Sequence, residues 1–204
     1  MAAPRSPPRS RSDDDPVRDA AFRRELVGLI PHLRAFARTL CGDPTAADDL
    51  AQDAMLKAWD ARASFEMGTN MKAWTFMILR NQFYSEKRRS WRQSQLDQEA
   101  AERTLVAVDD PEAPVALDEL RQGLAMLPIE QREALVLVGA GGFAYEEAAA
   151  ICECAVGTVK SRVSRARRAL QGILESGAYT RDGSSAGEAM SSILAHAERL
   201  SQAK

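Results

Sequence analysis

Apolar side chains recur every three to four residues along most of the chain, which is the spacing of helices that pack on one face. Alternating apolar and polar positions, which are typical of half-buried strands, are rare, whereas Ala, Leu, Arg and Glu are abundant. The pattern therefore predicts an all-α fold. Helices are expected over residues 17–40, 44–59, 71–91, 115–126 and 129–138, and two more within 143–174.

Local signals predict where several of these helices begin and end. Pro31 lies inside the first pattern, so we expect a kink or two consecutive helices there. Gly42 follows the last apolar position and predicts a helix end. Asp43 before Pro44 predicts a helix start, with the aspartate as the N-cap.

Composition divides the chain into two domains and three other segments. Residues 1–16 are rich in Pro, Ser and Arg and are expected to form a disordered arm. Residues 95–114 are acidic and weakly apolar, which predicts a flexible linker. Domains are therefore expected over residues 17–94 and 115–176. Residues 177–204 form an extension whose apolar stripe predicts one amphipathic helix, either docked or frayed.

The most informative stretch is residues 143–174, where two short helical patterns meet at a turn over residues 152–155. The second pattern is strongly basic, and its apolar positions form one stripe, which leaves small polar and cationic residues on the rest of the helix. A solvated basic helix is the simpler interpretation, but the tight turn and the short preceding helix favour a helix-turn-helix that reads DNA. The stripe holds Val159, Val163, Ala166 and Leu170, while Lys160, Ser161, Ser164, Arg165 and Arg168 point elsewhere.

The formal net charge of −2 argues at first against a partner as acidic as DNA. The charges are segregated, however, since residues 80–92 and 154–174 are basic and residues 97–119 are acidic. No apolar run is long enough to span a membrane, and no signal-peptide core is present at the N-terminus, so we expect a cytoplasmic protein without a membrane partner.

The three cysteines, Cys41, Cys152 and Cys154, do not indicate a disulfide framework. Cys152 and Cys154 could hold a metal or take part in redox chemistry, but a zinc site needs four close ligands, and both histidines lie far away in the sequence. We therefore expect no metal and no cofactor, and these cysteines are interpreted as small residues in the turn.

Two further surfaces each allow two interpretations. Residues 44–59 have an acidic face that includes Leu56, which is either solvated or a docking surface for a basic protein. Residues 71–91 carry more apolar and aromatic positions than one buried stripe can hold, next to a basic run. Some of these positions must be exposed or only partly covered, as on surfaces that stack single-stranded bases. For Trp74 and Phe76 we favour a place in the core.

Four motifs in order across both predicted domains resemble those of bacterial sigma factors of the sigma-70 family. The chain resembles the small extracytoplasmic-function (ECF) type over about residues 22–174. More narrowly, residues 83–86 and 138–149 are similar to the alphaproteobacterial general-stress-response (EcfG-type) group. The four motifs are Asp48-Asp49-Leu50-x-Gln52-Asp53, Asn70-x-x-Ala73-Trp74-x-Phe76-x-Ile78-Leu79-Arg80-Asn81, Leu127-Pro128-x-x-Gln131-Arg132-Glu133-Ala134 and Val156-Gly157-Thr158-Val159-Lys160-Ser161-Arg162.

The resemblance implies a sigma region 2 helical bundle over residues 17–94 and a sigma region 4 helix-turn-helix domain over 115–176. It implies a function in directing core RNA polymerase to promoters, without catalysis. Polymerase docking would use Asp49, Gln52, Asp53 and Leu56. Recognition of the −10 element would use Asn70, Arg80, Asn81, Tyr84, Lys87, Arg88 and Arg89. For the −35 element, Lys160, Ser161, Ser164 and Arg165 would meet base edges, and Thr158, Arg162 and Arg167 would meet phosphates.

The implied partners are core RNA polymerase, through the clamp of its largest subunit and its −35-side flap, promoter DNA, and an anti-sigma factor placed between the two domains. No small-molecule substrate is expected. Two alternatives remain open at this point: a stand-alone helix-turn-helix regulator, and a sigma-like decoy that only sequesters an anti-sigma protein. An enzyme is disfavoured because no nucleophile-base pair, phosphate loop or metal-ligand spacing is present.

The chain departs from the family pattern at two positions. Ala144 stands where a serine usually caps the first helix of the helix-turn-helix, and losing such a cap costs about 1 kcal/mol. Ser164 stands where some relatives carry a larger side chain, which puts its own base contact in question.

Overall fold

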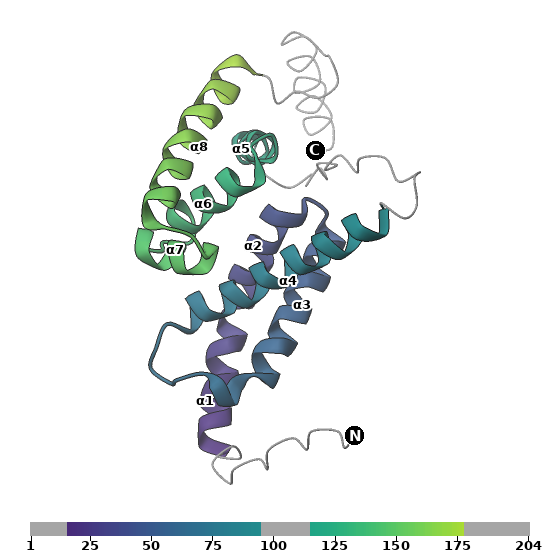
Figure 1. Ribbon diagram of the computed structural model, residues 1–204, viewed down its shortest axis with the longest axis vertical. Helices are drawn as coiled ribbons and strands as arrows, with labels where there is room; N and C mark the ends of the chain where they lie inside the picture. The colour runs from purple at the N-terminus through teal and green to yellow at the C-terminus, as the bar shows by residue number, and fades with distance from the viewer. Residues whose placement is uncertain (1–15, 95–114, 178–204) are drawn as a thin grey trace, which may run out of the picture.

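The computed structural model describes residues 16–94 and 115–177, and all regular structure within them is helical. Two helical bundles lie one above the other (Figure 1), which we name the N-terminal bundle (α1–α4) and the C-terminal bundle (α5–α8). The all-α prediction is confirmed. The helices are α1 (Pro16–Gly28), α2 (Ile30–Cys41), α3 (Pro44–Asp60), the short 3₁₀ helix η2 (Arg62–Ser64), α4 (Met71–Ser94), α5 (Val115–Ala125), α6 (Ile129–Gly139), α7 (Tyr145–Cys152) and α8 (Val156–Ser176).

The helix ends of the N-terminal bundle follow the predicted signals. The pattern around Pro31 is divided into two helices, with Leu29 between them. Gly42 ends α2 with a φ of 77°, a conformation that costs glycine little. Asp43 caps α3 by accepting a hydrogen bond from the Ala46 amide at 2.7 Å. Asn70 does the same for α4, since its Oδ1 accepts from the Ala73 amide at 3.0 Å.

The C-terminal bundle ends in the predicted helix-turn-helix. Ala144 has no side-chain oxygen to cap α7, but the Glu147 carboxylate accepts a hydrogen bond from the Ala144 amide at 2.9 Å. This is the half of a capping box that the third helical residue supplies. Glu153 then adopts a left-handed conformation with a φ of 51° and turns the chain into α8.

A cluster of aromatic rings fills the end of the N-terminal bundle near α1. The Phe22 ring lies 5.7 Å from Phe65 and 6.1 Å from Trp74, and Trp74 lies 5.0 Å from Phe65. Phe76 is buried in the core, as we favoured from the sequence, and the partly buried Trp74 packs against the aromatic cluster.

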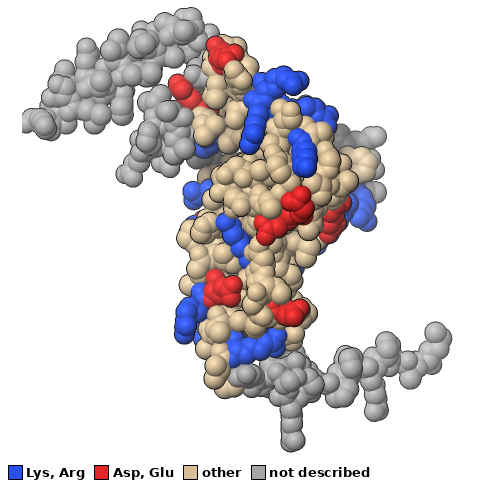
Figure 2. Space-filling model, turned by 90° about the vertical axis from the view of Figure 1, so that its left-hand side faces the viewer, with Lys and Arg blue, Asp and Glu red and all other residues tan. Residues whose placement is uncertain are grey.

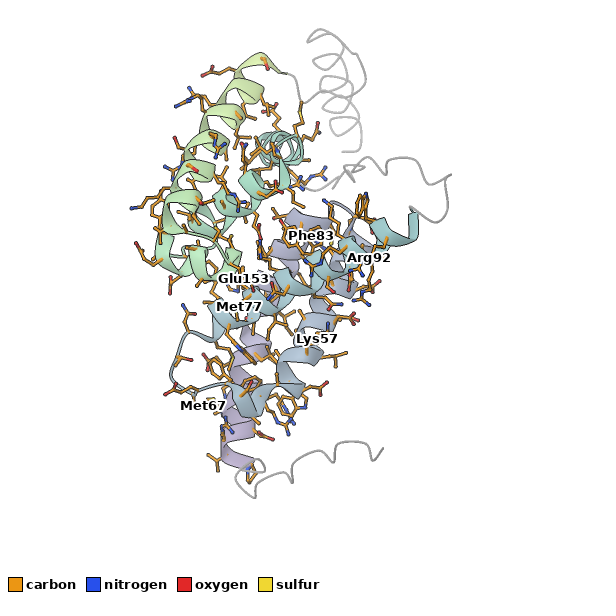
Figure 3. All side chains as sticks on the ribbon, in the orientation of Figure 1. Lys57, Met67, Met77, Phe83, Arg92 and Glu153 are labelled. Carbon is orange, nitrogen blue, oxygen red and sulfur yellow. The ribbon has the colours of Figure 1, made fainter. Side chains whose placement is uncertain are left out.

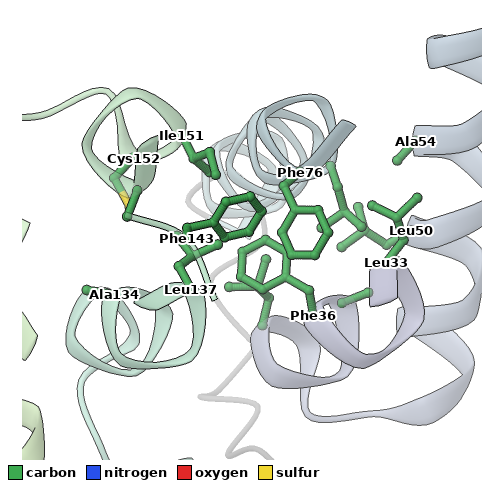
Figure 4. Close-up of a cluster of buried hydrophobic side chains, with 14 of the residues drawn as sticks. Leu33, Phe36, Leu50, Ala54, Phe76, Ala134, Leu137, Phe143, Ile151 and Cys152 are labelled. Atoms are coloured by element: carbon green, nitrogen blue, oxygen red, sulfur yellow. The ribbon is translucent and has the colours of Figure 1, made fainter. Parts of the chain in front are cut away.

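A second hydrophobic core is shared by the two bundles. Phe76 on α4 stacks on Phe36 at 4.8 Å and meets Phe143 of the C-terminal bundle edge-on at 5.1 Å (Figure 4). Leu137 and Ile151 belong to the same buried cluster. The surplus of apolar positions on α4 is thus explained, because α4 packs against helices on two sides.

The direct packing of the bundles bears on the predicted place of an anti-sigma factor. An anti-sigma factor placed between the domains would have to separate this shared core, and its place there stays a prediction. The predicted arm over 1–16, apart from Pro16, which begins α1, lies outside the described residues, as do the linker over 95–114 and the C-terminal helix beyond 177.

Candidate nucleic-acid interface

Helix α8 presents a polar face opposite its packed stripe. Val159, Val163 and Ala166 are buried, as predicted. Figure 2, in which the side of the molecule that carries α8 faces the viewer, shows several Lys and Arg side chains on the upper part. Lys160, Ser161, Ser164, Arg165 and Arg167 are exposed, and Thr158 and Arg162 are half-buried.

Contacts along α8 orient two of these side chains. The Arg165 guanidinium donates to the Ser161 carbonyl at 3.3 Å and to the Ser161 hydroxyl at 3.2 Å. The Lys160 ammonium lies 5.7 Å from the centre of the Tyr145 ring. Arg165 and Lys160 therefore present cations on an exposed helix face, which is suited to guanine edges or phosphates in a major groove.

Helix α4 carries the second basic surface, at its C-terminal end. Lys87, Arg88 and Arg89 are exposed, as a phosphate-binding surface requires. Trp91, which is 64% exposed, lies three and four residues beyond Arg88 and Lys87, and thus on the same side of the helix. Sequence reasoning overlooked this ring, although its spacing from the cations was visible there.

The other predicted −10 residues lie at the boundary with the C-terminal bundle and contact its carboxylates. Arg80 Nε donates to Glu133 Oε1 at 2.6 Å, and Tyr84 donates to Glu133 Oε2 at 3.2 Å. The Asn70 amide donates to Glu147 at 2.6 Å. The Asn81 amide donates to Glu153 at 2.9 Å, and Figure 3 shows Glu153 next to α4.

The buried Glu133 forms a polar cluster with the half-buried Tyr84 and Arg80. Burial raises the pKa of the Glu133 carboxyl, and the ion pair with Arg80 opposes that shift. Burial, followed by the nearby Glu133 charge, raises the pKa of the Tyr84 hydroxyl. Both groups are hydrogen-bonded, as buried polar groups must be to avoid a large desolvation cost.

A hollow of about 740 Å³ opens beside α4 next to this cluster. Arg80, Asn81, Tyr84 and Arg88 line it, together with Glu153. Four of the predicted −10 residues thus face one concave surface, together with a carboxylate of the C-terminal bundle.

Helix α3 has the predicted acidic face. Its inner side, from Ala47 to Ala58, is buried against the bundle. Leu56 is 63% exposed, which is unusual for a leucine of this bundle. Asp49, Gln52 and Asp53 are exposed beside it, whereas Asp48 forms an ion pair with Arg34.

Cys152 and Cys41 are poorly suited to redox chemistry. Burial raises the pKa of the Cys152 thiol to about 12 and that of Cys41 to about 11. A thiol of such high pKa is rarely a thiolate and therefore a weak nucleophile. No group of three potential metal ligands occurs among residues 16–94 and 115–177, and no helix in that part of the chain could cross a membrane.

Comparison with protein families matches both bundles. Residues 28–93 match the model of sigma-70 region 2, and residues 117–170 match the model of sigma-70, region 4. Together the two matches cover more than half of the chain.

Individual relatives agree with this assignment. The chain is 46% identical over 159 residues to the ECF RNA polymerase sigma factor EcfG of Rhodopseudomonas palustris, covering 78% of this chain and 87% of the relative. It is 47% identical to the sigma factor RpoE of Bartonella quintana, solved with the anti-sigma factor NepR, with a TM-score of 0.70 over 76% of this chain and 97% of RpoE. It is 26% identical to CnrH, solved with the cytosolic domain of CnrY, with a TM-score of 0.54 over 78% of this chain and 94% of CnrH. The chain therefore belongs to the ECF group of sigma-70 family RNA polymerase sigma factors, which direct core polymerase to promoters.

Proposed function

We propose that this sigma factor holds a promoter with two separate faces, one on each bundle, while core RNA polymerase keeps the faces in register. The observation that carries the proposal is the exposed cationic face of α8 in a protein of net charge −2. A chain whose net charge is negative gains little from general attraction to DNA, so polymerase must supply the remaining binding energy.

The α8 face is proposed to read the −35 element. Lys160, Ser161, Ser164 and Arg165 would meet base edges, because exposed residues in the first turns of a recognition helix reach the major groove. The half-buried positions of Thr158 and Arg162 suit phosphate contacts better, and Arg167 would add a third phosphate contact.

The α4 surface is proposed to bind the −10 element. Lys87, Arg88 and Arg89 would follow phosphates. Asn70, at the start of α4, would border the site that accepts an unpaired base. Polar residues line the corresponding pockets of enzymes that flip bases. Arg80, Asn81 and Tyr84 would complete this surface along the hollow beside α4.

The exposed α3 face is proposed to dock on the clamp of the largest polymerase subunit through Asp49, Gln52, Asp53 and Leu56. An exposed leucine ringed by acidic side chains suits a partner surface that is both basic and apolar. The C-terminal bundle would contact the −35-side flap.

Control by an anti-sigma factor in a stress response is proposed from the relatives, since RpoE of Bartonella quintana was solved with NepR and CnrH with CnrY. A partner of polymerase would act in the cytoplasm. Loss of polymerase binding on addition of the candidate anti-sigma factor would support this control, and an unchanged polymerase complex at saturating anti-sigma factor would contradict it.

Reconstituted transcription tests the proposed function. Purified chain and core polymerase are expected to start RNA at defined genomic promoters and to protect the −10 and −35 elements in footprints. An active core that yields no promoter-specific transcript with this chain would refute the proposal.

Substitution on α8 tests the −35 assignment. The double change Lys160→Ala and Arg165→Ala should weaken −35 protection by about tenfold or more, because each good base contact contributes roughly 1–3 kcal/mol. Binding to core polymerase should not change. Arg24→Ala, which removes an exposed arginine from α1, is the control and should transcribe like the parent chain.

A further inference from the structure

Three glutamates of the C-terminal bundle converge on the proposed −10 surface of the N-terminal bundle. Glu133 comes from α6, Glu147 from α7, and Glu153 from the turn between α7 and α8. Although separated in sequence, they meet a surface formed by the start and the middle of α4. We call these residues the carboxylate triad.

Every contact of the triad with α4 uses a donor that was assigned to DNA from the sequence. The Asn70 and Asn81 amides donate to Glu147 and Glu153 at 2.6 Å and 2.9 Å. Arg80 and Tyr84 both donate to Glu133. The acceptors are all anionic oxygens, which is the chemistry that phosphates present to the same donors.

The contact is a packed interface. Beneath the triad, Phe143 lies against Phe76, and the Lys72 ammonium donates to the Gly141 carbonyl at 2.8 Å. Glu133 is fully buried in the closed arrangement. Because Glu133 already accepts from Arg80 and Tyr84, a phosphate could take these two hydrogen bonds only after Glu133 and the C-terminal bundle moved away.

The proposed polymerase-docking face on α3 and the proposed −35 face on α8 remain accessible. Asp49, Asp53 and Leu56 on α3 are exposed, and so are Lys160 and Arg165 on α8. The contact between the bundles thus covers part of one proposed binding surface, at Arg80 and Tyr84, and leaves two others open.

The geometry points to the carboxylate triad as an internal competitor of promoter DNA: it engages four donors of the proposed −10 surface by phosphate mimicry and keeps the free chain closed. Core polymerase can still dock on the open α3 face, so its binding precedes the release of the −10 surface. This inference rests on the assignment of α4 to the −10 element. Lys87, Arg88 and Arg89 stay exposed, so the closed chain retains weak, salt-dependent binding to any DNA.

The test measures binding of the full-length free chain to a single-stranded oligonucleotide. The probe is the non-template strand of a −10 element that the holoenzyme protects in footprints. In the double variant Glu147→Gln and Glu153→Gln both carboxylates become neutral at unchanged size, and a glutamine at 147 can still accept from the Ala144 amide. We expect binding to tighten about fivefold or more, the lower range of coupling between two competing sites.

A matched variant controls for the change of net charge. Glu146→Gln with Glu175→Gln removes the same two charges from exposed positions of α7 and α8. Its oligonucleotide affinity should stay within about twofold of the parent chain, since charges far from the strand are screened.

The outcomes separate this inference from the proposed function. Equal oligonucleotide binding by parent and triad variant, with promoter transcription intact, would overturn the competition and leave the function standing. An equal gain in both double variants would also overturn it, because general charge would then explain the gain. Failure of the α4 assignment itself is distinguishable: Arg88→Ala with Arg89→Ala would leave −10 protection in the holoenzyme unchanged.

Discussion

At the scale of single residues, several side chains have a structural contact and a proposed DNA contact at once. Asn70 caps α4 through its Oδ1 and reaches Glu147 through its amide nitrogen. Arg80 lies over the Tyr84 ring and pairs with Glu133. A substitution at such a position changes both the free energy of unfolding and the proposed binding of DNA. The replacement residue must therefore keep one of the two contacts and remove the other.

Asn70 allows that separation. Asn70→Ala should lower the free energy of unfolding by about 1 kcal/mol, because an uncapped amide remains at the start of α4. Asn70→Ser keeps a capping oxygen but is too short to reach Glu147, so it should cost only a few tenths of a kcal/mol at the cap. Denaturant unfolding measures both, and equal losses would show that the cap contributes little.

The half-buried Tyr84 predicts a specific sensitivity of the stability to alkali. The folded chain holds the Tyr84 proton more tightly than the unfolded chain, whose tyrosines titrate near pH 10. The resulting stability is fully present below about pH 10 and is lost as pH rises toward the higher folded pKa, by about 1.4 kcal/mol per pH unit. Cys152 acts in the same direction from about pH 9 upward.

Tyr84→Phe should therefore flatten the fall of unfolding free energy above about pH 10, while costing about 1 kcal/mol at neutral pH through the lost hydrogen bond to Glu133. Chemical unfolding at a series of pH values provides the comparison. If the Tyr84→Phe profile ran parallel to the parent profile, Tyr84 would not be the group that titrates.

At the scale of elements, the sequence was most informative where a local rule decides the structure. Helix starts at Asp43 and helix ends at Gly42 follow from backbone chemistry within a few residues. The buried stripe of α8 follows from spacing alone. The partner of the second apolar side of α4 could not be predicted, because Phe76 and Phe143 are far apart in the chain and only tertiary packing brings them together.

The candidate site divides in the same way. Exposure of Lys160, Arg165 and Leu56 was predictable, because each lies off the apolar stripe of its own helix. Pairing of Arg80 with Glu133 was not, since opposite charges in two domains reveal no geometry in a sequence. The exposure of Trp91 beside the basic run was not predicted, because the sequence interpretation of α4 considered only the aromatic residues that precede that run.

Substitution by aspartate at two neighbouring positions tests the buried side and the exposed side of α8. Val163→Asp places a carboxylate where the side chain is buried, and should cost several kcal/mol and unfold the C-terminal bundle. Ser164→Asp lies on the exposed face and should change stability by no more than about 0.5 kcal/mol. It should nevertheless weaken −35 binding, because it sets a negative charge against DNA. Circular dichroism and footprinting distinguish these results, and comparable unfolding by both variants would contradict the assigned faces.

At the scale of the whole molecule, the two bundles share one core and one polar boundary. The shared core around Phe76 and Phe143 stabilises the closed arrangement, and the carboxylate triad directs it onto the proposed −10 surface. The chain is thereby expected to exist in two arrangements: closed when free, and open on polymerase with both DNA faces available. The α3 face is exposed in the closed arrangement, so the closed chain can dock on polymerase before the two bundles separate.

The distance between the bundles tests this account most directly. Donor and acceptor dyes can be placed at Ser90 on α4 and Ser176 on α8, two exposed serines, through non-natural amino acids that leave the cysteines intact. The free chain should show one population of high energy transfer, and saturating core polymerase should replace it with one of low transfer. Transfer in the free chain that already equals that of the polymerase-bound chain would contradict the closed arrangement.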